Sequence, residues 1–152
     1  MPVPATAPAS SISTLAAAGR LRLSITRLNR LLRRNAETGL SPSQLSALAT
    51  IERHGPMTLG ALAEHERVAP PSVTKVVAKL EATGLVHRQA SPADGRVALV
   101  SLTDGGISLL AESRQRKNQW LAVRLSRLTP EERARLADAL DVLETLIGQE
   151  PA

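Results

Sequence analysis

Residues 70–106, PPSVTKVVAKLEATGLVHRQASPADGRVALVSLTDGG, predict a short amphipathic helix followed at once by a β-hairpin. Four aliphatic side chains fall within one arc of this helix at about 100° per residue: Val73, Val76, Val77 and Leu80. Small and cationic residues make up the opposite side, and Gly84 is well placed to end the helix. We therefore expect one buried face and one slim, positively charged outer face.

Two β-compatible runs, residues 85–89 and 97–102, follow that helix. The connection between them is rich in turn-forming residues, so we expect a hairpin with an exposed tip. Arg96 lies at this tip, and Asp94 could hold its guanidinium group in one orientation. An Asp–Gly pair is also what any turn prefers, so a purely structural role for Asp94 remains open.

Two further helices are expected before residue 70. Ser41 and Gln44 form a capping-box pattern that begins one of them, and Thr58 can cap a third, short helix. That short helix should break around Arg67, because two consecutive prolines cannot lie inside a helix. Pro71 instead suits the first turn of the next helix.

Long apolar stripes flank this region on both sides. An N-terminal helix over about 13–38 places Leu21, Ile25, Leu28 and Leu32 on one face. Between Arg20 and Arg34 it carries six arginines and no acid, and these arginines either form a solvated face or approach phosphates. A long helix from Thr103 has an entirely polar middle, so we expect it to be buried at two separate places. The last helix begins with a capping box at Thr129, and its stripe is Leu136, Leu140, Leu143 and Ile147.

The composition limits the classes of function. The chain has 152 residues, which suits a single domain over 13–152 after a disordered tail at 1–12. Aromatic residues make up 1% of it, which argues against modules that stack bases on aromatic rings. The absence of cysteine excludes thiol chemistry and Cys-ligated metals. A net charge of +5 favours an anionic partner, and no apolar run is long enough to span a membrane.

Short helices joined by a tight break and followed by a hairpin form a winged helix-turn-helix, which suits double-stranded DNA. The slim outer face of the helix after the twin prolines fits a major groove, with its first residues nearest the base edges. Phosphates would lie near the N-terminus of the third helix, and the hairpin tip would meet a minor groove. The expected DNA-binding residues are Thr58, Pro71, Ser72, Thr74, Lys75, Lys79, Asp94 and Arg96.

The polar residues do not form the patterns expected of a metal site or a catalytic site. The three histidines lack metal-ligand spacing, so we expect no metal and no cofactor. His87, Ser91 and Asp94 are residue types found in catalytic sites, but they lie on a hairpin without a nucleophile elbow or paired buried carboxylates, so we expect no enzyme. Trp120 suits packing at a dimer base better than lining an effector pocket.

The chain resembles the MarR family of bacterial transcriptional regulators from about Leu21 to Ile147. The DGR motif at 94–96 and LEATGLV at 80–86 carry the most specific part of the resemblance. It implies a mainly α fold with a small β-hairpin wing. The DNA-binding winged helix would cover about 41–102, and dimerisation helices at about 13–38 and 103–148 would build a triangular homodimer. It further implies a cytoplasmic repressor of a palindromic operator that is released by a small aromatic or phenolic acid.

The chain also departs from the family pattern. Arg67 stands where family members commonly place Gly in the helix-turn-helix break, and Glu66 stands where an apolar residue is more usual. Arg67 could instead reach the phosphate backbone. Ser91 replaces an acid at the start of the wing loop, and without cysteine a thiol-based peroxide sensor is excluded. A ligand-independent regulator and a winged helix used for protein contacts remain alternatives.

Overall fold

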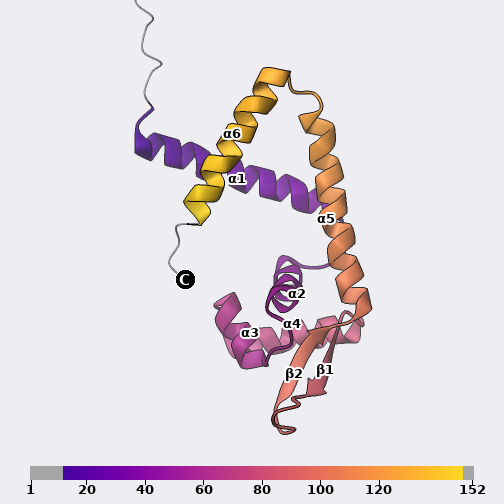
Figure 1. Ribbon diagram of the computed structural model, residues 1–152. Helices are drawn as coiled ribbons and strands as arrows, with labels where there is room; N and C mark the ends of the chain where they lie inside the picture. The colour runs from indigo at the N-terminus through magenta and orange to yellow at the C-terminus, as the bar shows by residue number, and fades with distance from the viewer. Residues whose placement is uncertain (1–11, 149–152) are drawn as a thin grey trace, which may run out of the picture. The chain divides into compact units, whose positions relative to one another are not determined.

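The computed structural model describes residues 12–148 and consists of helices with one β-hairpin (Figure 1). Its elements are, in chain order, α1 (Thr14–Ala36), α2 (Pro42–His54), α3 (Leu59–Glu66), α4 (Pro70–Ala82), β1 (Val86–Ala90), β2 (Ala98–Leu102), α5 (Asp104–Leu125) and α6 (Pro130–Ile147). The described chain divides into two compact units, 12–35 and 36–148. The expected mainly α fold with a hairpin wing is confirmed.

Side-chain caps set the helix starts where the sequence predicted them. Ser41 and Gln44 form the capping box of α2, and Thr129 and Glu132 form that of α6. The Thr58 hydroxyl oxygen accepts the backbone N–H of Ala61 at the start of α3. Each cap satisfies donors that the first turn of a helix leaves without a partner.

Pro71 lies in the first turn of α4, as expected. The helix begins at Pro70, so both prolines lie in its first turn and neither lies in its interior. Proline is tolerated there because the first N–H groups of a helix have no intrahelical acceptor. At the other end, Gly84 has a φ of 71°, in the left-handed region that favours glycine, as expected for the residue that ends this helix.

One aliphatic core lies between α2, α3, α4, the hairpin and the first half of α5. Its fully buried members come from all of these segments except α5, which contributes Leu110 at 4% exposure. In the hairpin, β1 and β2 are antiparallel with Val86 opposite Leu102, and Met57 adds a short bridge to Val100. The largest fully buried apolar side chains are Leu48, Ile51, Leu62, Leu80, Val77, Val86 and Val100.

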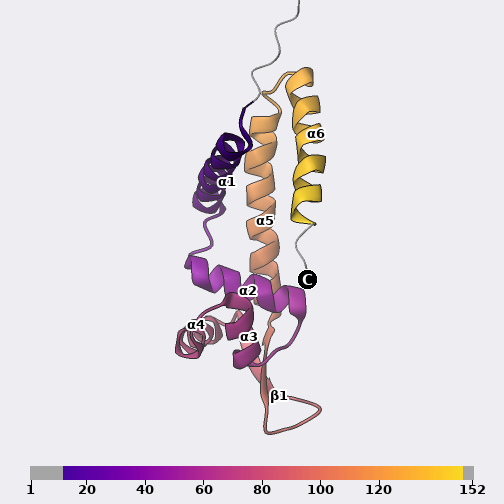
Figure 2. The same cartoon turned by 90° about the vertical axis from the view of Figure 1, so that its left-hand side faces the viewer.

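The first turns of α5 pack closely on the connection after α4. A Cβ atom added at Gly106 would lie 2.2 Å from the carbonyl oxygen of Leu85, so only glycine fits this position. Thr103, the N-cap residue, also donates its hydroxyl to the carbonyl oxygen of Gly84 at 2.6 Å. These contacts anchor α5 to the winged helix, and Figure 2 shows α2, α3 and α4 grouped at this end of α5.

The remainder of α5 and all of α6 differ from the expectation of buried stripes. The buried residues of α5 are Gly106, Leu110 and Ser113, all in its first half, so only one of the two expected burial places is found within residues 12–148. No residue of α6 within the described range is buried. Leu140 is 49% exposed and Ile147 is 71% exposed. Leu136 and Leu143 are half-buried, so the apolar stripe of α6 is only partly covered within residues 12–148.

The helix α1 shows the same feature in the other unit. Leu21 and Leu32 are half-buried, whereas Ile25 is 52% exposed and Leu28 is 42% exposed. The predicted stripe is present but is not covered as a core would be. The predicted N-terminal tail lies outside the described residues except for Ile12, and residues 149–152 of the predicted domain also lie outside them.

Candidate nucleic-acid interface

The helix α4 separates a buried face from an exposed one, as its sequence predicts. Val73, Val77 and Leu80 are at most 3% exposed and face the core. The expected recognition residues are all exposed: Pro71, Ser72, Thr74, Lys75 and Lys79. In the described part of the chain neither lysine takes part in an ion pair, since the ion pairs there all involve arginine. Their ammonium groups are therefore available to an anion.

Few backbone donors are free at the start of α4. Pro70 and Pro71 carry no N–H group, and the N–H of Ser72 donates to the carbonyl oxygen of Ala69 at 2.9 Å. The Thr74 hydroxyl donates to the carbonyl oxygen of Pro70 at 3.1 Å, so it keeps only its acceptor lone pairs and methyl group for a ligand. Binding at this helix end must depend on side chains.

The tip of the wing, residues 91–97, is a hydrogen-bonded turn from which one cation projects. The Asp94 carboxylate accepts the backbone N–H of Arg96 at 3.0 Å and lies 3.7 Å from the Arg96 Nε atom. The N–H of Val97 donates to the Asp94 carbonyl oxygen at 2.9 Å. The Arg96 side chain is 95% exposed. Asp94 thus shapes the turn firmly through the backbone and orients the guanidinium group only loosely.

An ion pair that the sequence did not predict joins the wing to α4. The Nε atom of Arg88, on β1, lies 3.2 Å from a carboxylate oxygen of Glu81, near the end of α4. Both side chains are partly exposed, so the pair adds little to stability. It links β1 of the wing to the last turn of α4. No local sequence pattern predicts this pair, because Glu81 and Arg88 lie on two different elements whose packing brings them together.

The residue types that suggested catalysis are separated from one another. His87 Nε2 lies 3.2 Å from the Ser101 hydroxyl oxygen, whereas Ser91 accepts the N–H of Ala93 within the wing tip. Within residues 12–148 no group of three His, Asp or Glu side chains could hold a metal ion. The rings of His54 and His65 stack with centroids 4.2 Å apart, which their spacing did not suggest.

Residues 40–98 match the model of the MarR family. The HTH-type transcriptional regulator MT0903.1 of Mycobacterium tuberculosis is 45% identical over 135 residues, which cover 88% of this chain and 94% of that one. The chain belongs to the MarR family. It is a transcriptional regulator, and the named members are regulators rather than enzymes.

Two solved structures share the MarR-type fold of this chain. A structure from Pseudomonas aeruginosa assigned as a transcriptional regulator protein has a TM-score of 0.79 and 34% identity, covering 90% of this chain and 96% of the other. A mutant of MepR from Staphylococcus aureus, bound to an oligodeoxyribonucleotide, has a TM-score of 0.69 and 19% identity, covering 90% and 99%. None of the helices within residues 12–148 has the length and apolar character needed to cross a membrane.

The two departures from the MarR pattern in the helix-turn-helix break have structural explanations. Arg67 ends α3 in the left-handed conformation, with φ 54° and ψ 42°, and its N–H donates to the carbonyl oxygens of Ala63 and Glu64. An arginine can thus replace glycine here, at a cost of roughly 1 kcal/mol or more in backbone strain. The Glu66 carboxylate accepts the Thr50 hydroxyl from α2, which satisfies a polar group at a half-buried position.

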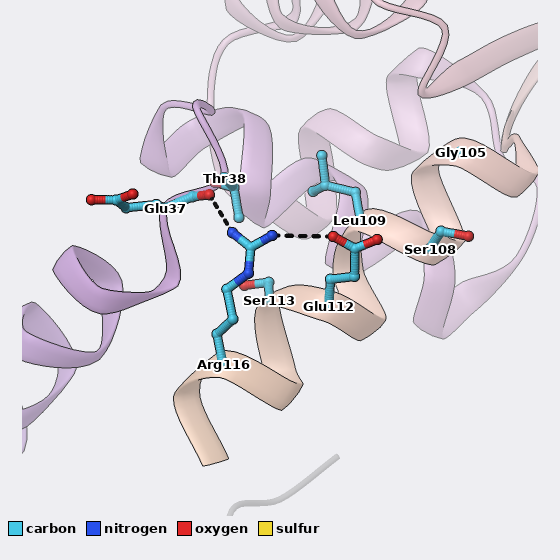
Figure 3. Close-up of a pocket in the computed structure, with 8 residues that line it drawn as sticks. All are labelled: Glu37, Thr38, Gly105, Ser108, Leu109, Glu112, Ser113 and Arg116. Carbon is cyan, nitrogen blue, oxygen red and sulfur yellow. Dashed lines mark hydrogen bonds and ion pairs between the residues drawn. The ribbon is translucent and has the colours of Figure 1, made fainter. Parts of the chain in front are cut away.

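A cavity of about 230 Å³ lies between the segment after α1 and the first half of α5 (Figure 3). The Arg116 guanidinium donates to the carbonyl oxygens of Ala36 and Glu37 at 3.0 and 2.7 Å and lies 3.1 Å from the Glu112 carboxylate. The buried Ser113 hydroxyl oxygen has no hydrogen-bond partner in the described structure. The full lining is Glu37, Thr38, Gly105, Ser108, Leu109, Glu112, Ser113 and Arg116.

Proposed function

We propose that this MarR-family chain regulates transcription by binding double-stranded DNA as a homodimer in the cytoplasm. The helix α4 would enter the major groove and the wing would follow the backbone into the minor groove. The observation that carries the proposal is the exposed face of α4, where Lys75 and Lys79 project beside the small residues Ala78 and Ala82. A face this slim can approach base edges without steric conflict.

The residues divide by role. Ser72, Thr74 and Lys75 lie in the first turns of α4 and would meet base edges, as would Pro71 through van der Waals contact. Lys79 lies one turn further on and would meet a phosphate, together with the N-terminus of α3 at Thr58. Arg96 would enter the minor groove, with Asp94 shaping the turn that presents it.

Exposed apolar residues support the homodimer. The uncovered side chains of α1 and α6 include Leu15 at 85%, Val142 at 68%, Leu146 at 56% and Ile147 at 71% exposure. Patches of this kind mark interaction surfaces. Charge also favours contact between copies, since α1 has six arginines and no acid whereas α6 has five acids and two arginines. A two-fold dimer would place two α4 helices in successive major grooves, about 34 to 36 Å apart, on a palindromic operator.

The solved MepR complex supports DNA as the partner, because a protein of the same fold holds an oligodeoxyribonucleotide. The net charge of +5 agrees with a polyanionic ligand. Repression would follow where the occupied operator overlaps a promoter.

The test of this function is a salt-dependent DNA titration. Duplexes captured by the purified protein from fragmented genomic DNA are sequenced, and the enriched duplex is titrated by fluorescence anisotropy at 50 to 200 mM salt. We expect an affinity that falls by about a thousandfold or more over this range, since several phosphates release counterions on binding. A flat response on every duplex would favour the alternative of a winged helix used for protein contacts. Sedimentation that shows a monomer at all concentrations would exclude the dimer.

The cavity at Arg116 supports release by a small acid. Arg116 is the only cation in the lining, and a ligand carboxylate would compete with Glu112 for its guanidinium group while the unpaired Ser113 hydroxyl donates to the ligand. Such a ligand would loosen the link between α5 and the segment at Ala36 and Glu37.

Salicylate provides the probe for this second proposal, and salicylamide is its neutral control. We expect salicylate to weaken operator binding by the wild-type protein and to lose this effect in Ser113→Ala and Arg116→Gln. Equal effects of the acid and the amide would place the ligand elsewhere. No effect of either compound would favour a ligand-independent regulator.

A further inference from the structure

The first residue after α3 adopts a strained backbone conformation. Arg67 has a φ of 54°, a conformation that glycine adopts without cost and that an arginine adopts at a cost of roughly 1 kcal/mol or more. The turn itself needs only the backbone, since its hydrogen bonds come from the N–H groups of Arg67 and Val68. The side chain is therefore not required to close the turn.

The start of α4 offers fewer backbone donors to a phosphate than a helix normally does. The N-terminus of a helix binds anions through its free N–H groups. In α4 the first two positions are prolines, and the third N–H, that of Ser72, is bonded to the carbonyl oxygen of Ala69 at 2.9 Å. No side chain caps this end either. A DNA strand that passes this helix end would need a donor from elsewhere.

Arg67 is in position to supply that donor. It lies three residues before Pro70 and is exposed, and within residues 12–148 its side chain makes neither an ion pair nor a hydrogen bond. Arg67 and Pro70 border the same surface hollow of about 390 Å³, which also includes the small residues Gly60 and Ala63. The hollow thus leaves open space beside Arg67 for the sugar-phosphate backbone of a DNA strand.

We propose that Arg67 binds a DNA phosphate at the start of α4 and replaces the N–H donors that Pro70, Pro71 and Ser72 do not provide. This inference rests on the proposed DNA-binding function. A guanidinium group suits the task because its planar set of donors matches two phosphate oxygens at once. The backbone strain at Arg67 is then the cost of having a long cationic side chain at a position where glycine would offer DNA no side-chain donor.

Glu64 also borders the hollow, and its negative charge would repel a phosphate bound there. Removing that charge with Glu64→Gln should strengthen DNA binding about twofold to threefold on all sequences. No change in affinity, or a weaker affinity, would place the DNA backbone away from this hollow and contradict the proposal.

The central experiment compares Arg67→Gly with the wild-type protein on the captured operator and on a scrambled duplex. We expect affinity to fall about fivefold to tenfold on both duplexes, with the slope of log affinity against log salt reduced by about one phosphate contact. The melting temperature should be unchanged or higher, because glycine relieves the left-handed strain. Binding loss without loss of stability separates a ligand contact from a structural role.

Two further variants complete the design. Arg67→Asn keeps a residue that tolerates the left-handed conformation, removes the charge, and should behave like Arg67→Gly on DNA. Arg127→Ala removes the same charge in the connection between α5 and α6 and should leave the salt slope unchanged. Wild-type affinity and slope in both Arg67 variants would overturn the inference while the DNA-binding function stands. A wild-type protein that binds no duplex would instead overturn the function itself.

Discussion

The winged helix with the adjoining first half of α5 (residues 36–113) and the helices α1 and α6 contain comparable apolar stripes but differ in how those stripes are covered. In the winged helix, Leu62, Val77 and Leu80 have no exposed surface at all. In α6 no described residue is buried, and in α1 only Ala36, at its very end, is buried. The first region completes its core within one chain, whereas α1 and α6 leave much of their apolar surface exposed.

The difference shows that periodicity predicts a buried face without saying which molecule buries it. A stripe at intervals of three and four residues gives a helix one apolar side in either case. Whether that side meets the same chain depends on the connections between helices. The winged helix has short connections and a hairpin that close the core, so its stripes find one another.

The strongest test of this comparison is a matched pair of leucine truncations. Leu62→Ala, in the complete core, should lower the free energy of unfolding by about 2 to 5 kcal/mol, because it leaves a cavity among fully buried neighbours. Leu140→Ala, at 49% exposure in α6, should cost less than half as much in dilute protein. Urea denaturation followed by circular dichroism measures both. Equal costs would mean that α6 is as well buried as the core.

A charged residue in the exposed apolar surface of α6 tests the proposed homodimer directly. Leu146→Glu should weaken the homodimer by about a hundredfold, roughly 2 to 3 kcal/mol, because a carboxylate would be buried in an apolar interface. Sedimentation equilibrium measures the dissociation constant. Glu144→Gln in the same helix is the control and should change it only slightly. A Leu146→Glu protein that remains fully dimeric would place the interface elsewhere.

The two lysines of α4 should respond differently to truncation. Lys75→Ala should weaken operator binding by about 1 to 3 kcal/mol and leave a scrambled duplex less affected, because it removes a base contact. Lys79→Ala should weaken both duplexes alike and reduce the salt slope by about one. Anisotropy titrations on both duplexes distinguish these outcomes. Equal losses for Lys75→Ala would make that residue a phosphate contact as well.

The smallest expected effect belongs to the wing. Arg96→Ala should cost about 1 kcal/mol on operators flanked by A·T-rich sequence and less on G·C-rich flanks, because a narrow minor groove attracts the guanidinium group more strongly. Operators that differ only in their flanks provide the measurement. An identical loss on both flanks would show that Arg96 contacts phosphate rather than the groove.

Local signals predicted most of the fold. The capping residues Ser41, Thr58 and Thr129 act within four residues of the sequence, so a single-chain pattern is enough to place them. The aliphatic arc of α4 and the turn at Asp94 are similarly local. The missed features join distant residues. They include the His54–His65 stack, the pair between Arg114 and Glu52, and the Arg116 contacts with Ala36 and Glu37.

The candidate site was partly predictable for the same reason. Exposure of Lys75 and Lys79 follows from the position of Val73, Val77 and Leu80 on one helix. The strain at Arg67 and the partner of Glu66 could not be read from residue types, since the first depends on how α3 ends and the second on Thr50 from α2.

Residue order alone was enough to establish the helices, their caps, the hairpin and the cationic face of α4, because each depends on interactions within a few residues. Folding settled three other matters: which stripes became core, which polar groups paired across the molecule, and how little backbone α4 leaves free for a ligand. These depend on contacts between segments far apart in the chain, and such contacts exist only once the chain has closed on itself.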